Sequence, residues 1–395
     1  MVTDAYPPMR TSCAVQMHDL AQAFLQEGHQ ATIITPNSQL KSSLTIDWQE
    51  GVQVIQVKAL ESKDVNYVRR ILAEFINPFL IWRALKKDPQ FSQNLFNGII
   101  WYSPTIFWGP LIKRLKKQFQ VKSYLILRDI FPDWAFDLGL IKKGLTYQFL
   151  KSVERFQYAQ ADLIGVQSPN NLRYFQSHHP QLSAKVEVLW NWIGASHKTS
   201  CPIDLSQSPL AGRKIFIYAG NMGVAQGISS LIELARNLAY RNDIGFVFVG
   251  RGNHVENLKS AIKEGGLTNT LFFDEIEPSQ IPSLYAQCFA GLITLDPRHK
   301  TQNIPGKFLT YLQSGLPIFA MGNSGNDLES LIAQYQLGIY IDINCKNNNL
   351  SLEDHIIEFI EVHQGKLKIT GREYLLGLFS AKKAVIQILE NFQIH

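Results

Sequence analysis

Cysteine is scarce in this sequence. Only four cysteines occur among 395 residues, far apart and without CxxC or Cys/His spacing: Cys13, Cys201, Cys288 and Cys345. This scarcity argues against a disulfide framework and against a zinc site, and it fits a reducing cytosol. The adjacent histidines His178 and His179 have no third ligand in register, so we expect no metal site.

Long apolar runs are also missing. No uninterrupted stretch reaches the roughly 18 apolar residues that a bilayer-spanning helix needs, and no signal-peptide pattern opens the chain. We therefore expect a cytoplasmic protein that is neither exported nor integral to a membrane. P-loop, GxSxG and HExxH patterns do not occur, so the mechanisms that depend on them are not expected.

Positive charge is modest and unevenly distributed. The formal net charge is +5, but residues 1–200 hold 22 Lys and Arg against 15 Asp and Glu, while the remainder holds 16 against 18. The first half therefore carries the basicity. Nucleic-acid binding is disfavoured, because the overall charge is small and no basic stripe with interleaved aromatic residues is present.

The length and the alternation of patterns predict two α/β domains. A chain of 395 residues that is 46% hydrophobic is too long for one compact core. Short β-rich runs alternate with amphipathic helix-length segments, as in parallel sheets crossed over by helices. The expected strands are Ala31–Thr35, Val52–Val57, Gly98–Tyr102, Tyr124–Leu127, Leu163–Gln167, Lys214–Ala219, Phe246–Val249, Thr270–Phe273, Gly291–Leu295 and Pro317–Ala320.

The boundaries of these domains follow from the same pattern. We expect one doubly wound domain over 1–200, a second over 201–370, and a final segment 371–395 that packs back toward the first domain. Its helix is predicted to run from Arg372 to Phe392. Residues 1–4 resemble the end of a strand, so either the chain starts upstream or its first strand is short.

A glycine-rich turn separates the strand at Lys214–Ala219 from the following helix. Gly220, Asn221, Gly223 and Gln226 lie in it. Backbone N–H groups and the helix dipole at such a turn favour a phosphate, although a tight structural turn explains the glycines equally well. Nearby, Gly250-Arg251-Gly252 lacks the third glycine of a dinucleotide fingerprint, which argues against a nicotinamide dehydrogenase.

Two cations stand near these turns. Arg251 follows a predicted strand, where its guanidinium can pair with a diphosphate. Alternatively, Arg251 is a solvated turn residue. Lys307 opens a helix, where the dipole disfavours a cation unless an anion binds there, although a surface lysine needs no partner. A polar loop with Gln302 and Asn303 precedes Lys307 and reads as a binding loop.

The first half offers carboxylates and a basic apolar segment. Arg128, Asp129 and Asp133 follow a predicted buried strand, where carboxylates can accept hydroxyl protons or form an ion pair and a helix cap. The segment Tyr67–Lys87 has an apolar middle between basic ends, and a second basic cluster spans residues 113–117. Together these indicate attachment to an anionic membrane surface, unless they form an ordinary helix with one solvated face.

This ensemble resembles the family 4 glycosyltransferases of bacterial O-antigen, capsule and colanic-acid assembly, particularly the group with L-fucosamine transferases. The resemblance spans nearly the whole chain. Its carriers are Tyr6-Pro7-Pro8, Gly28-His29, the run from Arg128 to Asp133, the turn from Tyr218 to Gly227, Val249-Gly250-Arg251-Gly252, and Pro305-Gly306-Lys307 through Gly315-Leu316-Pro317.

The resemblance implies a GT-B fold, with two Rossmann-like domains that face each other across a cleft. It implies a metal-independent transferase that retains anomeric configuration, uses no cofactor beyond its nucleotide-sugar substrate, and stabilises the departing phosphate. The residues so implicated are Asp129, Lys307 and Arg251 for catalysis, Gly220, Asn221, Gly223, Gln226, Arg251, Gln302, Asn303, Lys307 and Thr310 for the donor, and Arg10, Tyr102, Arg128 and Asp133 for the acceptor.

Three departures from the family pattern affect the interpretation. Asn221 and Gln226 replace an arginine and a lysine, and Gln302 and Thr310 replace a pair of glutamates. Thr11-Ser12 stands near a loop that is glycine-rich in the family. We expect a UDP-sugar, such as an N-acetylated deoxyhexosamine, and an undecaprenyl-diphosphate-linked acceptor at the cytoplasmic membrane face. An inactive sugar-nucleotide-binding subunit or a sugar-nucleotide epimerase are the alternatives.

Overall fold

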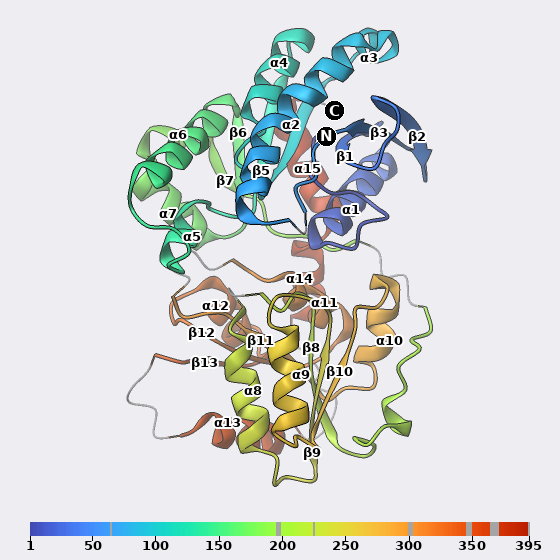
Figure 1. Cartoon of the computed structure of the whole chain (residues 1–395). Coiled ribbons are helices and arrows are strands. Elements are labelled where there is room, and N and C mark those ends of the chain that lie inside the picture. Colours follow the sequence, from blue (N-terminus) through green and yellow to red (C-terminus); the bar gives the residue numbers. More distant parts are fainter. Residues whose placement is uncertain are drawn as a thin grey trace. The chain divides into compact units, whose positions relative to one another are not determined.

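The computed structural model describes residues 1–63, 65–194, 199–223, 226–298, 303–344, 350–363 and 371–393. The chain forms two compact α/β units (Figure 1). Unit 1 comprises Met1–Gly194 together with Phe379–His395, and unit 2 comprises Ala195–Leu378. The last helix of the chain therefore belongs to the same unit as its beginning.

Unit 1 contains seven named strands and eight α-helices in its described residues. The strands are β1 (Thr32–Asn37), β2 (Leu44–Gln49), β3 (Val52–Lys58), β4 (Gly98–Ser103), β5 (Lys122–Leu127), β6 (Leu163–Val166) and β7 (Val186–Val188). The helices are α1 (Ser12–Gln26), α2 (Tyr67–Lys87), α3 (Pro89–Gln93), α4 (Gly109–Phe119), α5 (Asp133–Asp137), α6 (Leu145–Gln160), α7 (Pro169–His178) and α15 (Ala381–Phe392).

The strands of unit 1 run in two ladders, β2-β3-β1 and β4-β5-β6-β7, which Val2 joins. Val2 pairs in parallel with Ile34 of β1 and with Trp101 of β4. Its N–H donates to Ile100 O and its carbonyl accepts from the Tyr102 N–H. The strand expected at the start of the chain is thus a single bridging residue between β1 and β4.

Buried aliphatic and aromatic side chains explain why these segments form a covered sheet. β5 is buried from Ser123 to Leu127, and such a run needs helices on both faces. One face packs Trp101, Leu125 and Ile164 in a cluster with residues of α2 and α4. The other face packs Ile126 in a cluster with residues of α1 and α15. Sequence patterns missed β2, which is antiparallel to β3 and mostly exposed or half-buried, and the three-residue β7.

Unit 2 has one six-stranded parallel sheet in the order β10-β9-β8-β11-β12-β13. Its strands are β8 (Lys214–Ala219), β9 (Ile244–Val249), β10 (Thr270–Phe273), β11 (Ala290–Thr294), β12 (Ile318–Gly322) and β13 (Gly338–Asp342). Its helices are α8 (Ile228–Asn237), α9 (Val255–Glu264), α10 (Ile281–Tyr285), α11 (Gly306–Ser314), α12 (Asp327–Gln334), α13 (Leu352–Val362) and α14 (Arg372–Leu378). Five of these strands were predicted, while β13 was not.

The sheet order of unit 2 defines where a ligand can bind. The chain proceeds from β8 to β9 and β10 on one side, and then returns to place β11, β12 and β13 on the other side. The gap between the carboxyl ends of β8 and β11 is therefore a topological switch point, the usual ligand position in doubly wound sheets.

The prediction of one helix from Arg372 to Phe392 is wrong. Ser380 is extended, with φ −82° and ψ 143°, and it separates α14 from α15. Ile193 bridges this break, because its N–H donates to Phe379 O and its carbonyl accepts from the Ala381 N–H. Ser380 Oγ then accepts from the Lys383 N–H and caps α15. Backbone pairing and the cap together replace one helical turn.

Candidate donor site and acceptor residues

The glycine turn of unit 2 lies at the switch point, directly after β8. Gly220 N–H donates to Val249 O and Met222 N–H donates to Arg251 O, so the turn is bonded to the end of β9. Gly227, with φ 58°, begins α8. A Cβ added to Gly227 would lie 3.1 Å from Thr294 Oγ1 at the end of β11. The turn after β8 is thus hydrogen-bonded to the end of β9 on one side and lies against the end of β11 on the other.

Gly250 and Gly252 allow the close approach of the two turns. Both have positive φ, 142° and 143°. A Cβ on Gly250 would lie 2.1 Å from Gly220 O, and one on Gly252 would lie 2.6 Å from the Met222 carbonyl. Any larger residue would push the two turns apart. These glycines therefore serve backbone packing, in line with the sequence, which lacks the third glycine of a dinucleotide fingerprint.

Lys307 of α11 extends into this region. Its Nζ donates to the Tyr218 hydroxyl at 2.9 Å and to Gln226 Oε1 at 3.0 Å. It also lies 4.1 Å from the centroid of the Tyr218 ring. The Tyr218 hydroxyl in turn donates to Asn221 O at 2.7 Å. Lys307, Tyr218, Gln226 and Asn221 form one connected cluster, which we call the Lys307 cluster.

Burial lowers the pKa of Lys307 to about 7. Its side chain is half-buried. The ammonium donates to two neutral oxygen atoms and lies against a ring face, and these contacts take the place of water. No carboxylate among the described residues contributes to this pKa. The site therefore holds a cation whose charge is costly until an anion arrives.

The other predicted donor residues have different surroundings. Arg251 is half-exposed, and its Nε lies 3.2 Å from Glu275 Oε2 in an ion pair. Thr310 Oγ1 donates to Lys307 O one helical turn back. Asn303 is half-buried just before α11, and Gln302 lies outside the described residues. Lys307 thus contacts Gln226 directly and is linked to Asn221 through the Tyr218 hydroxyl, while the Arg251 carbonyl accepts from the N–H of Met222, the residue after Asn221.

In unit 1, two predicted acceptor residues belong to a buried polar network. The Tyr102 hydroxyl donates to Gln16 Oε1 at 2.6 Å, and Gln16 Nε2 donates to Asn191 Oδ1. The Arg128 guanidinium lies 4.5 Å from the ring centroid of Trp192, and its Nη1 donates to Leu189 O. Burial lowers the pKa of Arg128 below its ordinary value. The network ties α1 to β4, β5 and the segment after β7.

The remaining candidate residues of unit 1, for the acceptor and for catalysis, are not known to join this network. Asp133 accepts from the hydroxyls of Tyr147 and Tyr174, at 2.5 and 2.6 Å, and from Lys151 Nζ at 3.0 Å. Despite burial, these partners hold the pKa of Asp133 below its ordinary value. Asp129 is half-buried two residues after β5, and Arg10 is exposed in the loop before α1. The assignment of Arg10 to the acceptor and of Asp129 to catalysis remains a prediction.

The sequence did not identify Tyr218 as a residue of the candidate donor site. Tyr218 was counted as part of strand β8, since nothing in a strand pattern indicates a ring that supports a lysine 89 positions later. The described residues contain no group of three or more His, Cys, Asp or Glu side chains that could hold a metal ion. No described helix is long and apolar enough to cross a membrane.

Comparison with known families concerns mainly unit 2. Residues 204–366 match the family model for glycosyl transferases group 1. This range contains the glycine turn, Arg251 and Lys307, so the Lys307 cluster lies inside the matched domain.

Two bacterial proteins are similar over longer stretches. The Pseudomonas aeruginosa protein WbjE, which is named as a glycosyltransferase, is 24% identical over 267 residues, covering 66% of this chain and 65% of WbjE. The Escherichia coli K12 protein WcaI, which is named as a colanic acid biosynthesis glycosyl transferase, is 25% identical over 336 residues, covering 78% of this chain and 79% of WcaI. Both names concern transfer of sugars in bacteria.

Solved structures resemble the chain over nearly its full length. A sucrose-phosphate synthase from Thermosynechococcus elongatus has a TM-score of 0.73 at 13% identity, covering 99% of this chain and 98% of its own. Anabaena HepE, solved with UDP-glucose, has a TM-score of 0.69 at 15% identity and the same coverage. The similarity to these structures shows that the fold is GT-B, built from two Rossmann-like α/β domains. This confirms the fold predicted from the sequence.

Proposed function

We propose that this protein is a glycosyltransferase of bacterial polysaccharide or lipopolysaccharide assembly. The observation that carries the proposal is the Lys307 cluster at the switch point of the domain that matches glycosyl transferases group 1. The similarity to WbjE and WcaI supports the biological context, and the HepE complex supports a nucleotide-sugar donor.

The proposed donor mode follows from charge and geometry. A nucleotide sugar carries a diphosphate, whose charge grows on the leaving group as the sugar departs. Lys307 can meet that charge with little rearrangement, because Tyr218 and Gln226 already fix its ammonium. Arg251 can add a second cation if its guanidinium exchanges Glu275 for the phosphate. We propose that these two residues compensate the loss of cations at Asn221 and Gln226.

The finer specificity is also proposed. We assign a UDP-linked donor, retention of anomeric configuration, metal independence and a lipid-linked saccharide acceptor at the inner membrane face. Asp129 is proposed to contact reacting hydroxyl groups, because it follows the carboxyl end of β5 and is half-buried. Arg10 is the exposed acceptor candidate, while we propose that Tyr102, Arg128 and Asp133 act through buried contacts that fix the neighbouring segments of unit 1.

One experiment tests the proposed activity. Purified protein is incubated with a panel of UDP-, GDP- and dTDP-sugars, and release of the nucleoside diphosphate is measured. We expect slow release from one nucleotide class and none in the Lys307→Met variant. Release from no donor would refute the transferase.

A binding subunit without activity is the second candidate. It is favoured by Asn221 and Gln226, which stand where the family 4 resemblance implies an arginine and a lysine. In that case a donor would stabilise the protein by RT ln(1 + [L]/Kd) without being consumed. Thermal stabilisation without nucleoside diphosphate release therefore distinguishes the binding subunit from the enzyme.

A further inference from the structure

A stripe of exposed apolar side chains runs along α2 of unit 1. Its members are 39–78% exposed and follow the spacing i, i+4, i+7 and i+11, which places them on one helical face. They are Val68, Leu72, Phe75 and Phe79. The opposite face is already used for the core, where Ala73, Ile81 and Leu85 are buried. This helix therefore presents a second apolar face to the outside of unit 1.

α6 carries a matching stripe. Leu145, Phe149 and Phe156 are 86%, 49% and 39% exposed, with the spacing i, i+4 and i+11, and Ser152 lies in the same line. The buried residues of α6, among them Leu150 and Tyr158, again occupy the other side. Exposed apolar stripes on two helices of one unit exceed the scattered apolar residues of an ordinary surface.

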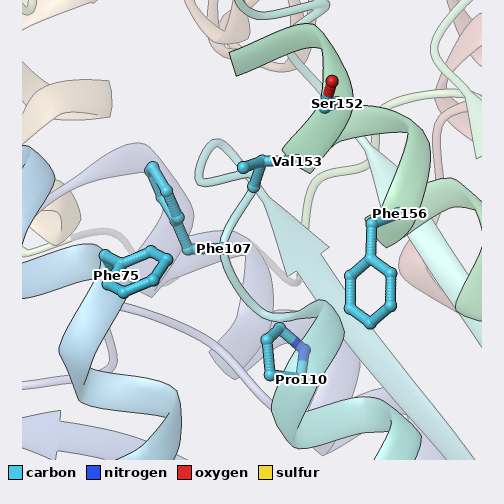
Figure 2. A pocket seen from close by; sticks show the side chains of 6 residues that line it. All are labelled: Phe75, Phe107, Pro110, Ser152, Val153 and Phe156. Atoms are coloured by element: carbon cyan, nitrogen blue, oxygen red, sulfur yellow. The ribbon is translucent and has the colours of Figure 1, made fainter. Parts of the chain in front are cut away.

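The two stripes meet at an open cavity of about 230 Å³. Figure 2 shows Phe75 of α2 and Phe156 of α6 on either side of it, with Phe107 and Pro110 at the start of α4 between them. Val153 and Ser152 complete the lining, and among these six described residues Ser152 alone has a polar side chain. Gly109 permits this arrangement, because a Cβ there would lie 2.9 Å from the Phe156 ring.

The three helices that line the cavity are rich in positive charge. The helices α2, α4 and α6 contain eleven Lys and Arg but only two Glu. Both glutamates are paired within unit 1, Glu74 with Arg70 and Glu154 with Lys151. On α4, Lys113 lies over the Phe156 ring at 5.9 Å and Arg114 over the Phe79 ring at 5.0 Å. Cations therefore sit beside the aromatic rings of both stripes.

We propose that this surface docks onto an anionic phospholipid bilayer, with one hydrocarbon chain entering the cavity and phosphate groups meeting Lys113 and Arg114. Apolar stripes with basic neighbours suit the boundary between headgroups and acyl chains. A second copy of the chain fits poorly, because a symmetric contact would bring the same excess of cations face to face. This inference rests on the proposed function in one respect: membrane docking would bring the proposed transferase to its lipid-linked acceptor.

Two of the basic residues in the segments predicted to attach to a membrane are held in ion pairs in the structure. Arg70 is paired with Glu74, and Lys116 is paired with Asp162 at 2.6 Å, so these two cations are engaged within unit 1. Lys113 and Lys117 are exposed on the same helix. Of the predicted basic cluster at residues 113–117, we therefore expect Lys113, Arg114 and Lys117 to meet the lipid, while Lys116 stays in its ion pair with Asp162.

Vesicle flotation tests the proposal with the full chain. Wild-type protein should float with vesicles of phosphatidylcholine and phosphatidylglycerol and remain in solution with phosphatidylcholine alone. Ser152→Glu places a carboxylate at the mouth of the cavity on an exposed helical position, and should lower the partition coefficient about tenfold or more. The matched control is Thr45→Glu, an equal charge change at an exposed position of β2, which should float like wild type.

A second measurement reports depth and does not depend on Ser152. Phe75→Trp should add fluorescence that lipids with brominated acyl chains quench, beyond the quenching of the wild-type tryptophans. Equal flotation of Ser152→Glu and Thr45→Glu, no added quenching, or self-association through this face in the absence of lipid would each overturn the proposal. Donor-induced thermal stabilisation and nucleoside diphosphate release without vesicles test the proposed function separately.

Discussion

At the residue scale, the proposed donor site depends on the ammonium group of Lys307, which burial in unit 2 makes unfavourable in its charged form. Tyr218 and Gln226 position Lys307 Nζ without neutralising it. Such a group destabilises the free protein and becomes favourable when an anion binds. Both effects can be measured: the thermal stability of the free protein and its stabilisation by the donor.

The first prediction is that Lys307→Met stabilises the free protein and abolishes its response to donor. The folded-state pKa of about 7 lies below the ordinary 10.5, so the unfolded chain binds more protons between these values. Stability of the wild type therefore rises with pH from about 7 to 10.5. Methionine removes this penalty, and each kcal/mol recovered raises Tm by about 2 to 4 °C.

Differential scanning fluorimetry at pH 7 and 9 checks this prediction. Lys259→Met is the matched control, because Lys259 is 46% exposed and pairs with Glu256 on the surface of α9. The control should keep its donor response. A Lys307→Met variant with a lower Tm than wild type at pH 7 would contradict the assignment of a strained ammonium.

The second prediction is that donor binding takes up protons above neutral pH. A bound diphosphate raises the pKa of Lys307, so at pH 8 the neutral amine of the free protein should gain about one proton per donor. Isothermal titration in two buffers of different ionisation enthalpy measures the number. Affinity should fall as pH rises through 7, and uptake near zero at pH 8 would show that Lys307 does not meet the phosphate.

The third prediction concerns the contact between the two glycine-containing turns. Gly250→Ala would place a Cβ 2.1 Å from Gly220 O, so the turn after β8 must move. We expect loss of donor stabilisation and a drop in stability well beyond about 1 kcal/mol. Gly266→Ala is the control, since Gly266 also has positive φ but no atom within 4 Å of an added Cβ. Equal effects of both variants would leave only backbone strain as the cause.

At the element scale, α15 is a structural part of unit 1. The fourth prediction is that Ile388→Ala, in the buried cluster with α1, lowers the stability of unit 1 by about 2 to 5 kcal/mol. Ile386→Ala lies on the same helix at 38% exposure and should cost much less. Scanning calorimetry with and without donor measures both variants. The donor should still stabilise unit 2 in Ile388→Ala, and similar losses in both variants would contradict the packing of α15.

The success of sequence analysis also differs by element. Buried parallel strands such as β5 and β9 were predictable, because their continuous apolar runs reflect burial on both faces. The strands β2 and β13 were not, since each lies at a sheet edge and is mostly half-buried or exposed. The break at Ser380 depends on pairing with Ile193, a contact that no local pattern contains.

At the scale of the whole molecule, the fold class followed from sequence and from the family resemblance, whereas the contacts within the candidate donor site did not. The resemblance pointed to Lys307 and the glycine turn, and both occur at the switch point. The support that Tyr218 gives Lys307 arises from the order of β8 and β11, which only the folded sheet defines. The apolar segment of α2 was evident in the sequence, but its exposed stripe and that of α6 were not, since periodicity does not tell which of two apolar faces is buried.

The measurement that most directly tests the central claim is sugar transfer to a lipid-linked acceptor. Wild-type protein, vesicles that contain a lipid extract of a producing bacterium, and the donor that passes the nucleotide panel are incubated together, and the lipids are analysed by mass. The account predicts a lipid-linked product heavier by one sugar residue, formed in step with nucleoside diphosphate and absent with Lys307→Met. A donor that binds tightly but is recovered intact, with no lipid gaining mass, would contradict it.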